Sequence, residues 1–301
     1  MPGPKLKTRL KAWWEGYDVP PDRDRGRQPP EGRIRATIRC EFSPEIDTMH
    51  MIFGRGRTLP LPTDPIADLT DPISTPSGMA TLIVGAETGG PPLHLAQAYG
   101  MQITALEPDR TWASIGDGIA RAVDFEGTFR IGPVDLPNVE LSKNRYHLVI
   151  SRLLLHACHN REQFYRKVER SLRRDGEMIL THYVLTEKVD REAIETAMIS
   201  SREPDPPALR TQSEEVRMLT ESGLRVGIVE DRTGPVLARL TEQFGQWQRL
   251  VEKIQQYDQQ PAMLQALLGH VEHWQSRISL MKSGDLLINR FRAQKRQNEL
   301  L

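Results

Sequence analysis

The chain is poor in cysteine, with only Cys40 and Cys158 among its 301 residues. Two cysteines cannot build a disulfide framework, so nothing in the sequence indicates an oxidising compartment. The chain also lacks an apolar run long enough to span a membrane, and its first residues carry no apolar signal-peptide core. We therefore expect a globular, cytoplasmic protein of one or two domains with no membrane span.

A net charge of either sign is absent too, because 40 basic and 40 acidic residues cancel. No overall field favours nucleic acid, and no nucleic-acid partner is expected. The charge is uneven locally, since residues 1–39 hold ten Lys or Arg against five Asp or Glu. This basic arm is either a solvated segment or a docking arm for an anionic surface or partner.

The most informative pattern is an apolar run, 81–84, that leads into a glycine-rich turn at 85–90. A second apolar run, 101–106, ends on Glu107. Strand, glycine turn, helix, strand and acid in this order are typical of a nucleotide-binding βαβ unit. Glycines let the backbone approach a ligand closely, and an acid at the end of the second strand can accept hydrogen bonds from ribose hydroxyls. The pattern predicts binding of an adenosine-containing small molecule.

Residues 1–77 are rich in proline and arginine, and we expect an N-terminal extension, with one short helix at 5–14, that packs on the main domain. From residue 78 to 301, strands alternate with helices, which predicts an α/β domain with a parallel, doubly wound sheet. Helical spacing over 236–283 predicts a helical hairpin inserted before the last strand. The clearest helix, 161–173, is expected to end near the Asp175-Gly176 stop signal. The expected strands are 81–84, 103–106, 128–131, 147–151, 178–184, 224–229 and 286–292.

With its elements in this order, the chain resembles class I S-adenosylmethionine-dependent methyltransferases. Among these it looks most like ubiquinone-type C-methyltransferases and the small-molecule methyltransferases related to glycine, sarcosine and phosphoethanolamine. The resemblance implies a Rossmann-like fold, S-adenosylmethionine as cofactor and methyl transfer to a small-molecule acceptor. It covers roughly 78–235 and the last strand, and is carried by segments 84–90, 106–109, 146–156, 171–180 and 213–224.

The resemblance also assigns roles to residues. The glycine turn would face the methionine half of the cofactor, Glu107 would hold the ribose, and Pro108 with 134–135 would border the adenine. Residues 151–152 would line the floor near the methyl group. The cofactor-binding residues implied are Gly85, Ala86, Glu87, Gly89, Gly90, Glu107, Pro108, Val134, Asp135, Ser151 and Arg152.

Two side chains are candidates for catalysis. His156 follows the fourth strand, on the side where open α/β sheets bind ligands, and its pKa class suits a general base. Tyr183, on the fifth strand, could line the acceptor pocket. Packing in the core is the alternative for both. His156, Cys158 and His159 are poorly spaced for one convergent metal site, so no metal is predicted.

The chain departs from the family at several positions. Ile83 stands where an acid normally helps to orient the amino-acid end of the cofactor, and Glu87 replaces the middle glycine of the turn. Pro133 stands near a position where an acid often contacts adenine, and His147 stands where an acid is common. A second hypothesis is therefore a catalytically silent methyltransferase-like protein that acts as a binding or assembly subunit.

Two parts of the chain could cover an acceptor pocket. The aromatic cluster at Trp13 and Trp14 could form a lid or anchor the extension. The apolar stripes of the hairpin most simply face the core, although they could also form a substrate cap, or an interface with a second copy or a paralogue.

Overall fold

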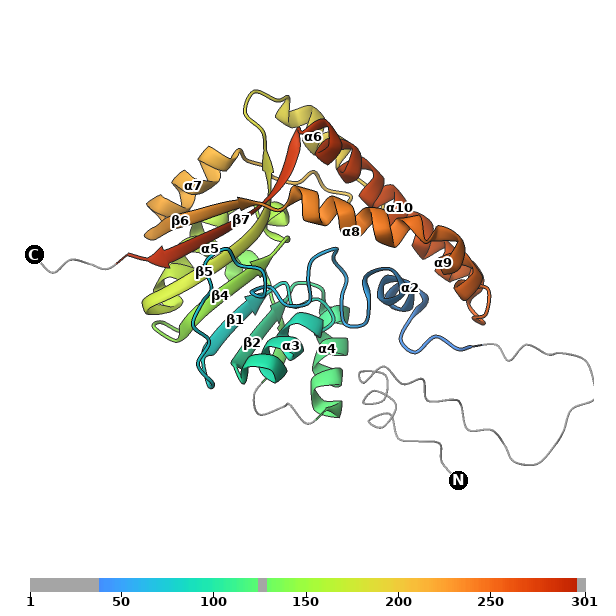
Figure 1. The fold of residues 1–301 in the computed structure, drawn as a ribbon, viewed down its shortest axis with the longest axis horizontal. Helices are drawn as coiled ribbons and strands as arrows, with labels where there is room; N and C mark the ends of the chain where they lie inside the picture. Colours follow the sequence, from blue (N-terminus) through green and yellow to red (C-terminus); the bar gives the residue numbers. More distant parts are fainter. Residues whose placement is uncertain (1–37, 124–128, 297–301) are drawn as a thin grey trace, which may run out of the picture.

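The computed structural model describes residues 38–123 and 129–296, which form a seven-stranded sheet with helices on both faces (Figure 1). The sheet order is β3-β2-β1-β4-β5-β7-β6. The strands are β1 (Ala80–Val84), β2 (Gln102–Glu107), β3 (Phe129–Pro133), β4 (Tyr146–Arg152), β5 (Leu172–Leu185), β6 (Leu224–Asp231) and β7 (Leu286–Lys295). The helices are α2 (Pro44–Phe53), α3 (Gly90–Tyr99), α4 (Arg110–Ala122), α5 (Arg161–Ser171), α6 (Arg191–Ala197), α7 (Gln212–Glu221), α8 (Thr233–Gly245), α9 (Trp247–Ile254) and α10 (Gln260–Ser283), with 3-10 turns η1 (Leu136–Asn138) and η2 (Leu155–Ala157).

The fold confirms the doubly wound α/β architecture, with one difference from an all-parallel sheet. Strands β1 to β5 pair in parallel, whereas β7 runs antiparallel to both β5 and β6. The reason lies in α8, α9 and α10, which follow β6 and return the chain to the end of the sheet that β6 has just left. Leu286, at the start of β7, therefore pairs with Leu185 at the end of β5.

Three clusters of buried apolar side chains hold the layers together. One lies under α3 and α4 and includes Ile83 and Ile119, and a second lies under α5 and α7 and includes Val84 and Phe164. The third joins α2 to α8, α9 and α10 beyond the carboxyl ends of the central strands. In Figure 1 these helices form a separate group beside the sheet. This third cluster covers the edge at which α/β sheets bind ligands.

Several boundaries differ from those expected. Helix α5 ends at Ser171, and β5 begins directly at Leu172, so the Asp175-Gly176 pair lies inside a strand. Asp175 has a positive φ of 60°, so the pair marks an irregularity in the strand and not a helix end. The insertion contains three helices instead of two, because the chain breaks between α8 and α9 at Gln246.

Helix α2 was not predicted and is the element that ties residues 38–79 to the rest of the protein. Ser43 caps it by accepting a hydrogen bond from the Ile46 amide, and Pro44 occupies its first turn. It packs on α10, α8 and α9. The predicted 5–14 helix and the Trp13-Trp14 cluster lie outside the described residues, and the boundary at residue 78 stays a prediction.

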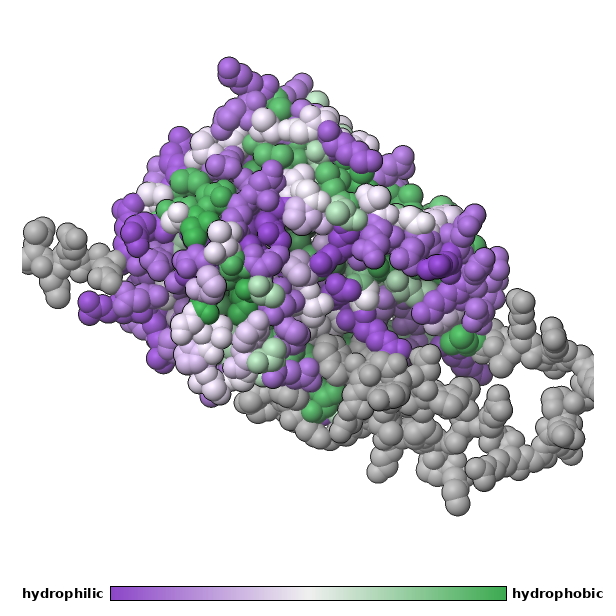
Figure 2. Space-filling model, in the orientation of Figure 1, coloured by the Kyte–Doolittle hydropathy of each residue, from purple (hydrophilic) through white to green (hydrophobic). Residues whose placement is uncertain are grey.

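The apolar stripes of the insertion face inward. Leu240, Leu267 and Trp274 are buried in the third cluster. Within the described ranges the exposed large hydrophobic side chains are Ile38, Ile199, Trp247 and Leu268. Figure 2 shows apolar patches separated by hydrophilic residues on the face it presents. A homodimer or paralogue interface through the insertion stays a prediction. None of the helices in the described part of the chain is long and apolar enough to cross a membrane.

Candidate active site

The candidate site lies where the strand order reverses. Strands β1 and β4 are neighbours, although the chain between them visits β2 and β3 first. Ligands of open α/β sheets bind outside the carboxyl ends of the strands at such a switch point. The glycine turn leaves β1 at this point, and every residue from Gly85 to Pro92 is buried.

Glu87 and Arg152 form a buried ion pair across the switch point. The Glu87 Oε1 atom accepts hydrogen bonds from Arg152 Nη2 at 2.7 Å and from Nε at 3.1 Å. The two side chains are only 1% and 2% exposed. Glu87 also has a positive φ of 58°, the left-handed conformation that favours glycine. The turn thus keeps its glycine geometry while presenting a carboxylate that Arg152 neutralises.

A segment that we call the cover, residues 54–62, lies on the glycine turn. Thr58 N and Leu59 N donate to Glu87 Oε2 at 2.6 and 3.0 Å. Arg152 Nη2 donates to the Pro62 carbonyl at 3.0 Å. The Gly90 amide donates to the Gly56 carbonyl at 2.8 Å, and a Cβ on Gly90 would lie 2.7 Å from that oxygen. The cover and the turn therefore fit together without room for a further side chain.

Helix α2, which leads into the cover, is also attached to the turn. A hydrogen bond of 2.8 Å joins His50 Nε2 and Thr88 Oγ1. Burial, and then the charge of Arg55, lower the pKa of His50 to about 3, so the imidazole is neutral at physiological pH.

Glu107 lies at the end of β2, directly beneath the turn. Its Oε2 accepts from the Glu87 amide at 2.8 Å, and its Oε1 accepts from the Asp109 amide at 3.1 Å. Burial raises the pKa of this carboxyl to about 8, against the opposing effect of the two amides. Glu107 is therefore placed where the sequence predicted, with a pKa that makes its charge depend on pH near neutrality.

The two halves of the predicted cofactor site differ in exposure. Pro108 and Asp135 are exposed and Val134 is half-buried, with its amide bonded to the Glu107 carbonyl at 3.1 Å. Gly85, Ala86, Gly89 and Gly90 are covered, and Ser151 and Arg152 are buried beside them at the end of β4. The adenine end predicted from sequence faces the surface, whereas the amino-acid end is closed.

The chemistry of the closed end fits an α-amino acid group. Such a group carries an ammonium, which is complementary to the Glu87 carboxylate, and a carboxylate, which is complementary to the Arg152 guanidinium. Two buried hydroxyls, Thr58 Oγ1 and Ser151 Oγ, have no hydrogen-bond partner within the described ranges. Buried polar atoms normally have partners, so these two favour a polar ligand nearby. The residues fit the group provided that the cover moves.

The structure brings the predicted catalytic pair together, but in a buried position. The rings of His156 and Tyr183 lie 5.1 Å apart, nearly perpendicular. His156 Nε2 lies 3.3 Å from Glu203 Oε1, and Glu203 is also paired with Arg277 of α10. Burial raises the pKa of Tyr183. Glu203 lies between α6 and α7, and Arg277 lies in α10. A role in catalysis stays a prediction for both His156 and Tyr183.

Across residues 38–123 and 129–296, no three His, Cys, Asp or Glu side chains are arranged to hold a metal ion. Sequence reasoning missed the cover because its partner Glu87 lies about 30 residues later, in the glycine turn. The glycines and prolines of 53–62 indicate turns and extended chain, but they do not indicate what this segment contacts.

Residues 82–180 match the family described as methyltransferase domain. This match covers about a third of the chain, and the sheet order with an antiparallel β7 is that of the Rossmann-like methyltransferase fold. No curated protein shows a significant sequence match to the chain.

Solved structures share the fold at low identity. Phosphoethanolamine N-methyltransferase 2 of Haemonchus contortus superposes with a TM-score of 0.71 at 18% identity, over 84% of this chain and 57% of that one. The chain thus spans a little over half the length of that enzyme. The geranyl diphosphate C-methyltransferase of Streptomyces coelicolor A3(2) has a TM-score of 0.57 at 12% identity, covering 73% and 72%. A cyclase, SpnF, has a TM-score of 0.53 at 17% identity, covering 73% and 75%.

Proposed function

We propose that the chain transfers a methyl group from S-adenosylmethionine to a small-molecule acceptor. The observation that carries the proposal is the position of Glu107, at the end of β2 and bonded to the Glu87 amide of the glycine turn. The match to the methyltransferase domain family supports it. The solved structures with this fold include a phosphoethanolamine N-methyltransferase bound to phosphomonomethylethanolamine and a geranyl diphosphate C-methyltransferase, both named for small molecules.

The residues would divide the work as follows. Glu107 would accept hydrogen bonds from the ribose, and Glu87 and Arg152 would pair with the ammonium and carboxylate of the methionine end. When bound, the cofactor supplies an activated methyl group on a sulfonium, so the protein has to bind, orient and exclude water. The cover and α2 suit the last task, because they already bury the turn.

A second candidate function is favoured by the same ion pair. Glu87 is already saturated, with two hydrogen bonds from Arg152 and two from the cover. If this arrangement is permanent, the domain is catalytically silent and works by binding a partner. The cyclase SpnF has the same fold, which illustrates that the fold does not fix the reaction.

Calorimetric titration with S-adenosylmethionine and S-adenosylhomocysteine distinguishes methyl transfer from the catalytically silent binding protein. Micromolar binding would support methyl transfer. A folded sample that binds neither up to millimolar concentration would leave the silent protein as the better account.

A substitution at Glu107 tests its proposed role in binding the cofactor ribose. Above pH 8, where the Glu107 carboxyl is ionised, we expect Glu107→Ala to weaken cofactor binding by about 1.5–3 kcal/mol, the usual loss for hydrogen bonds to a charged group. Glu140→Ala removes an exposed carboxylate and serves as the control. Equal affinities for Glu107→Ala and the unmodified protein would refute the assignment.

A further inference from the structure

A small cavity of about 130 Å³ is lined in part by Arg152. Its lining includes four arginines, Arg152, Arg232, Arg239 and Arg290, and one acid, Asp68. Pro60 and Pro62 of the cover and Pro65 of the segment after it also line the cavity. Pockets that hold a whole drug-sized ligand measure roughly 300–1,000 Å³, so this one has room for a single functional group.

The sheet places two of the four arginines, Arg152 and Arg290. Arg152 of β4, Thr181 of β5 and Arg290 of β7 are neighbours in register, and Glu230 of β6 follows Arg290. Side chains at matched positions of adjacent strands share a face. The row therefore presents two guanidinium groups on one side of the sheet, with a threonine between them.

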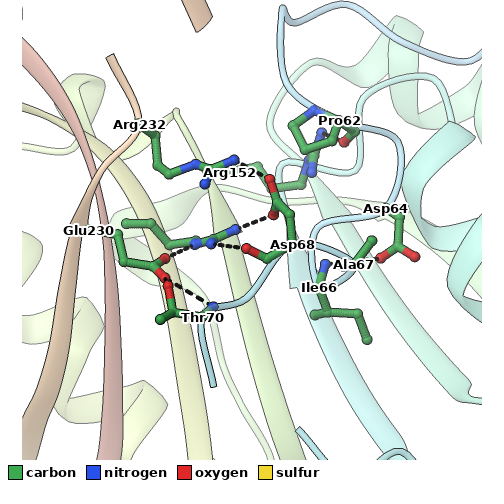
Figure 3. Close-up of polar contacts among 10 residues, drawn as sticks. Pro62, Asp64, Ile66, Ala67, Asp68, Thr70, Arg152, Glu230 and Arg232 are labelled. Carbon is green, nitrogen blue, oxygen red and sulfur yellow. Dashed lines mark hydrogen bonds and ion pairs between the residues drawn. The ribbon is translucent and has the colours of Figure 1, made fainter. Parts of the chain in front are cut away.

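Three of the arginines have acidic partners. Arg152 pairs with Glu87, Arg290 with Asp68 and Glu230, and Arg232 with Asp68. Figure 3 shows Arg232 reaching Asp68, with Arg152 and Pro62 beside them. Thr70 also binds Glu230 through its amide, at 3.1 Å, which fixes that carboxylate away from the cavity.

The fourth arginine has no such partner. Arg239 extends from α8, and its Nη1 atom is buried with no hydrogen-bond partner in the part of the chain that the structure describes. Four guanidinium groups against the carboxylates of Asp68, Glu87 and Glu230 leave one positive charge in excess.

Arg57, in the cover, is a further arginine that interacts electrostatically with Arg239 and Arg152, although it does not line the cavity. Burial lowers its pKa; Arg239 and Arg152 lower it further, and Glu87 opposes them. Arg57, Arg152 and Arg239 thus repel one another, and this repulsion is stronger because the region has a reduced dielectric constant.

We propose that this cavity binds a phosphate group, with Arg239 as its free donor. A phosphate ester carries at least one negative charge, which matches the excess positive charge of the lining, and its oxygens accept hydrogen bonds from the paired N–H groups of guanidinium. The phosphate would belong to a small organic ligand whose remainder lies outside the cavity. Its role as the anchor of a methyl acceptor rests on the proposed function, whereas phosphate binding does not.

The test is a titration of the full chain with inorganic phosphate, without cofactor and at constant ionic strength. Binding is measured by calorimetry, and the unfolding temperature is measured at each phosphate concentration. Sodium acetate and sodium chloride are the competing anions. We expect phosphate to raise the unfolding temperature and acetate and chloride to leave it nearly unchanged. Equal effects of all three salts would overturn the proposal.

Variants locate the site. Arg239→Gln removes the unpaired guanidinium without breaking an ion pair that we describe, and should weaken phosphate binding at least tenfold. Arg239→Lys keeps the positive charge but loses the paired N–H donors of the guanidinium, so it should bind phosphate with intermediate affinity. Arg249→Gln removes an exposed arginine of α9 and should behave like the unmodified chain. Unchanged phosphate affinity in folded Arg239→Gln would refute the assignment, whatever the cofactor titration shows.

Discussion

At the scale of single residues, Glu87 combines features that rarely occur together. It adopts a left-handed backbone conformation, is buried, and carries a charge that Arg152 balances. Non-glycine residues in this conformation cost roughly 1–3 kcal/mol and persist only when surrounding contacts hold them. In this protein the cover supplies those contacts. The residue that replaces the middle glycine of the turn is therefore part of a closed structure in which its hydrogen bonds are satisfied.

Breaking the Glu87–Arg152 pair should be costly. We expect Glu87→Gln to lower the free energy of unfolding by about 3–5 kcal/mol, because it leaves Arg152 buried and unpaired. Urea unfolding measures the change. The control is Glu162→Gln, which breaks the exposed Glu162–Arg166 pair of α5 and should cost less than about 0.5 kcal/mol. Similar small losses for both variants would mean that Arg152 readily finds another partner.

Glu107 should make stability depend on pH. Its pKa is about 8 in the folded protein against an ordinary value of 4.5, so the folded state holds more protons between these values. The stability that this carboxyl contributes is present below about pH 4.5 and is lost as the pH rises through 8, with a slope of up to about 1.4 kcal/mol per pH unit.

Glu107→Gln removes this titration. Denaturant unfolding at several pH values should show the unmodified protein losing stability relative to the variant between pH 5 and 8.5. Glu140→Gln, at an exposed position, should follow the unmodified protein throughout. A constant difference between Glu107→Gln and the unmodified protein would contradict the raised pKa.

At the scale of elements, the sequence predicted each strand by its apolar run and placed Glu107 at the correct strand end. These features depend on neighbours in the chain. The Glu87–Arg152 pair could not be predicted in the same way, because its partners are 65 residues apart and meet only through the sheet order. Helix α2 was missed because it begins at Ser43-Pro44 inside a proline-rich stretch, and its stability comes from packing on α10.

Helix α4 offers two glycines that should respond in opposite ways. Gly118 faces open space, so Gly118→Ala should raise the free energy of unfolding by about 0.5–1 kcal/mol through helix propensity. Gly116 faces the glycine turn: a Cβ would lie 2.3 Å from Ile131 Cδ1 and 3.2 Å from Gly89 N. Gly116→Ala should lower it by about 1–3 kcal/mol.

Urea unfolding of the two variants checks this contrast, since both make the same chemical change in one helix. A stabilised Gly116→Ala would show that the turn can move away from α4 without loss. That result would also weaken the case for a rigidly positioned turn.

At the scale of the whole molecule, the third apolar cluster connects the cover to the helical insertion. Phe53 is the last residue of α2 and is fully buried. Its ring makes edge contacts with His270 and Trp274 of α10, at centroid distances of 5.8 and 6.1 Å. The chain passes directly from Phe53 into the cover. Opening the glycine turn therefore has to disturb the packing between α2 and α10.

This connection predicts that loosening α2 should improve cofactor binding. If only an open form binds, the apparent dissociation constant is the intrinsic one divided by the open fraction. Phe53→Leu should destabilise the closed form by about 1 kcal/mol and so tighten S-adenosylhomocysteine binding by up to about fivefold. Phe164→Leu, in the cluster under α5, should cost similar stability without changing the affinity. Calorimetry and unfolding of both variants give the comparison. Weaker binding by Phe53→Leu would mean that the cover is part of the binding surface in its present position, and that the closed form is the one that binds.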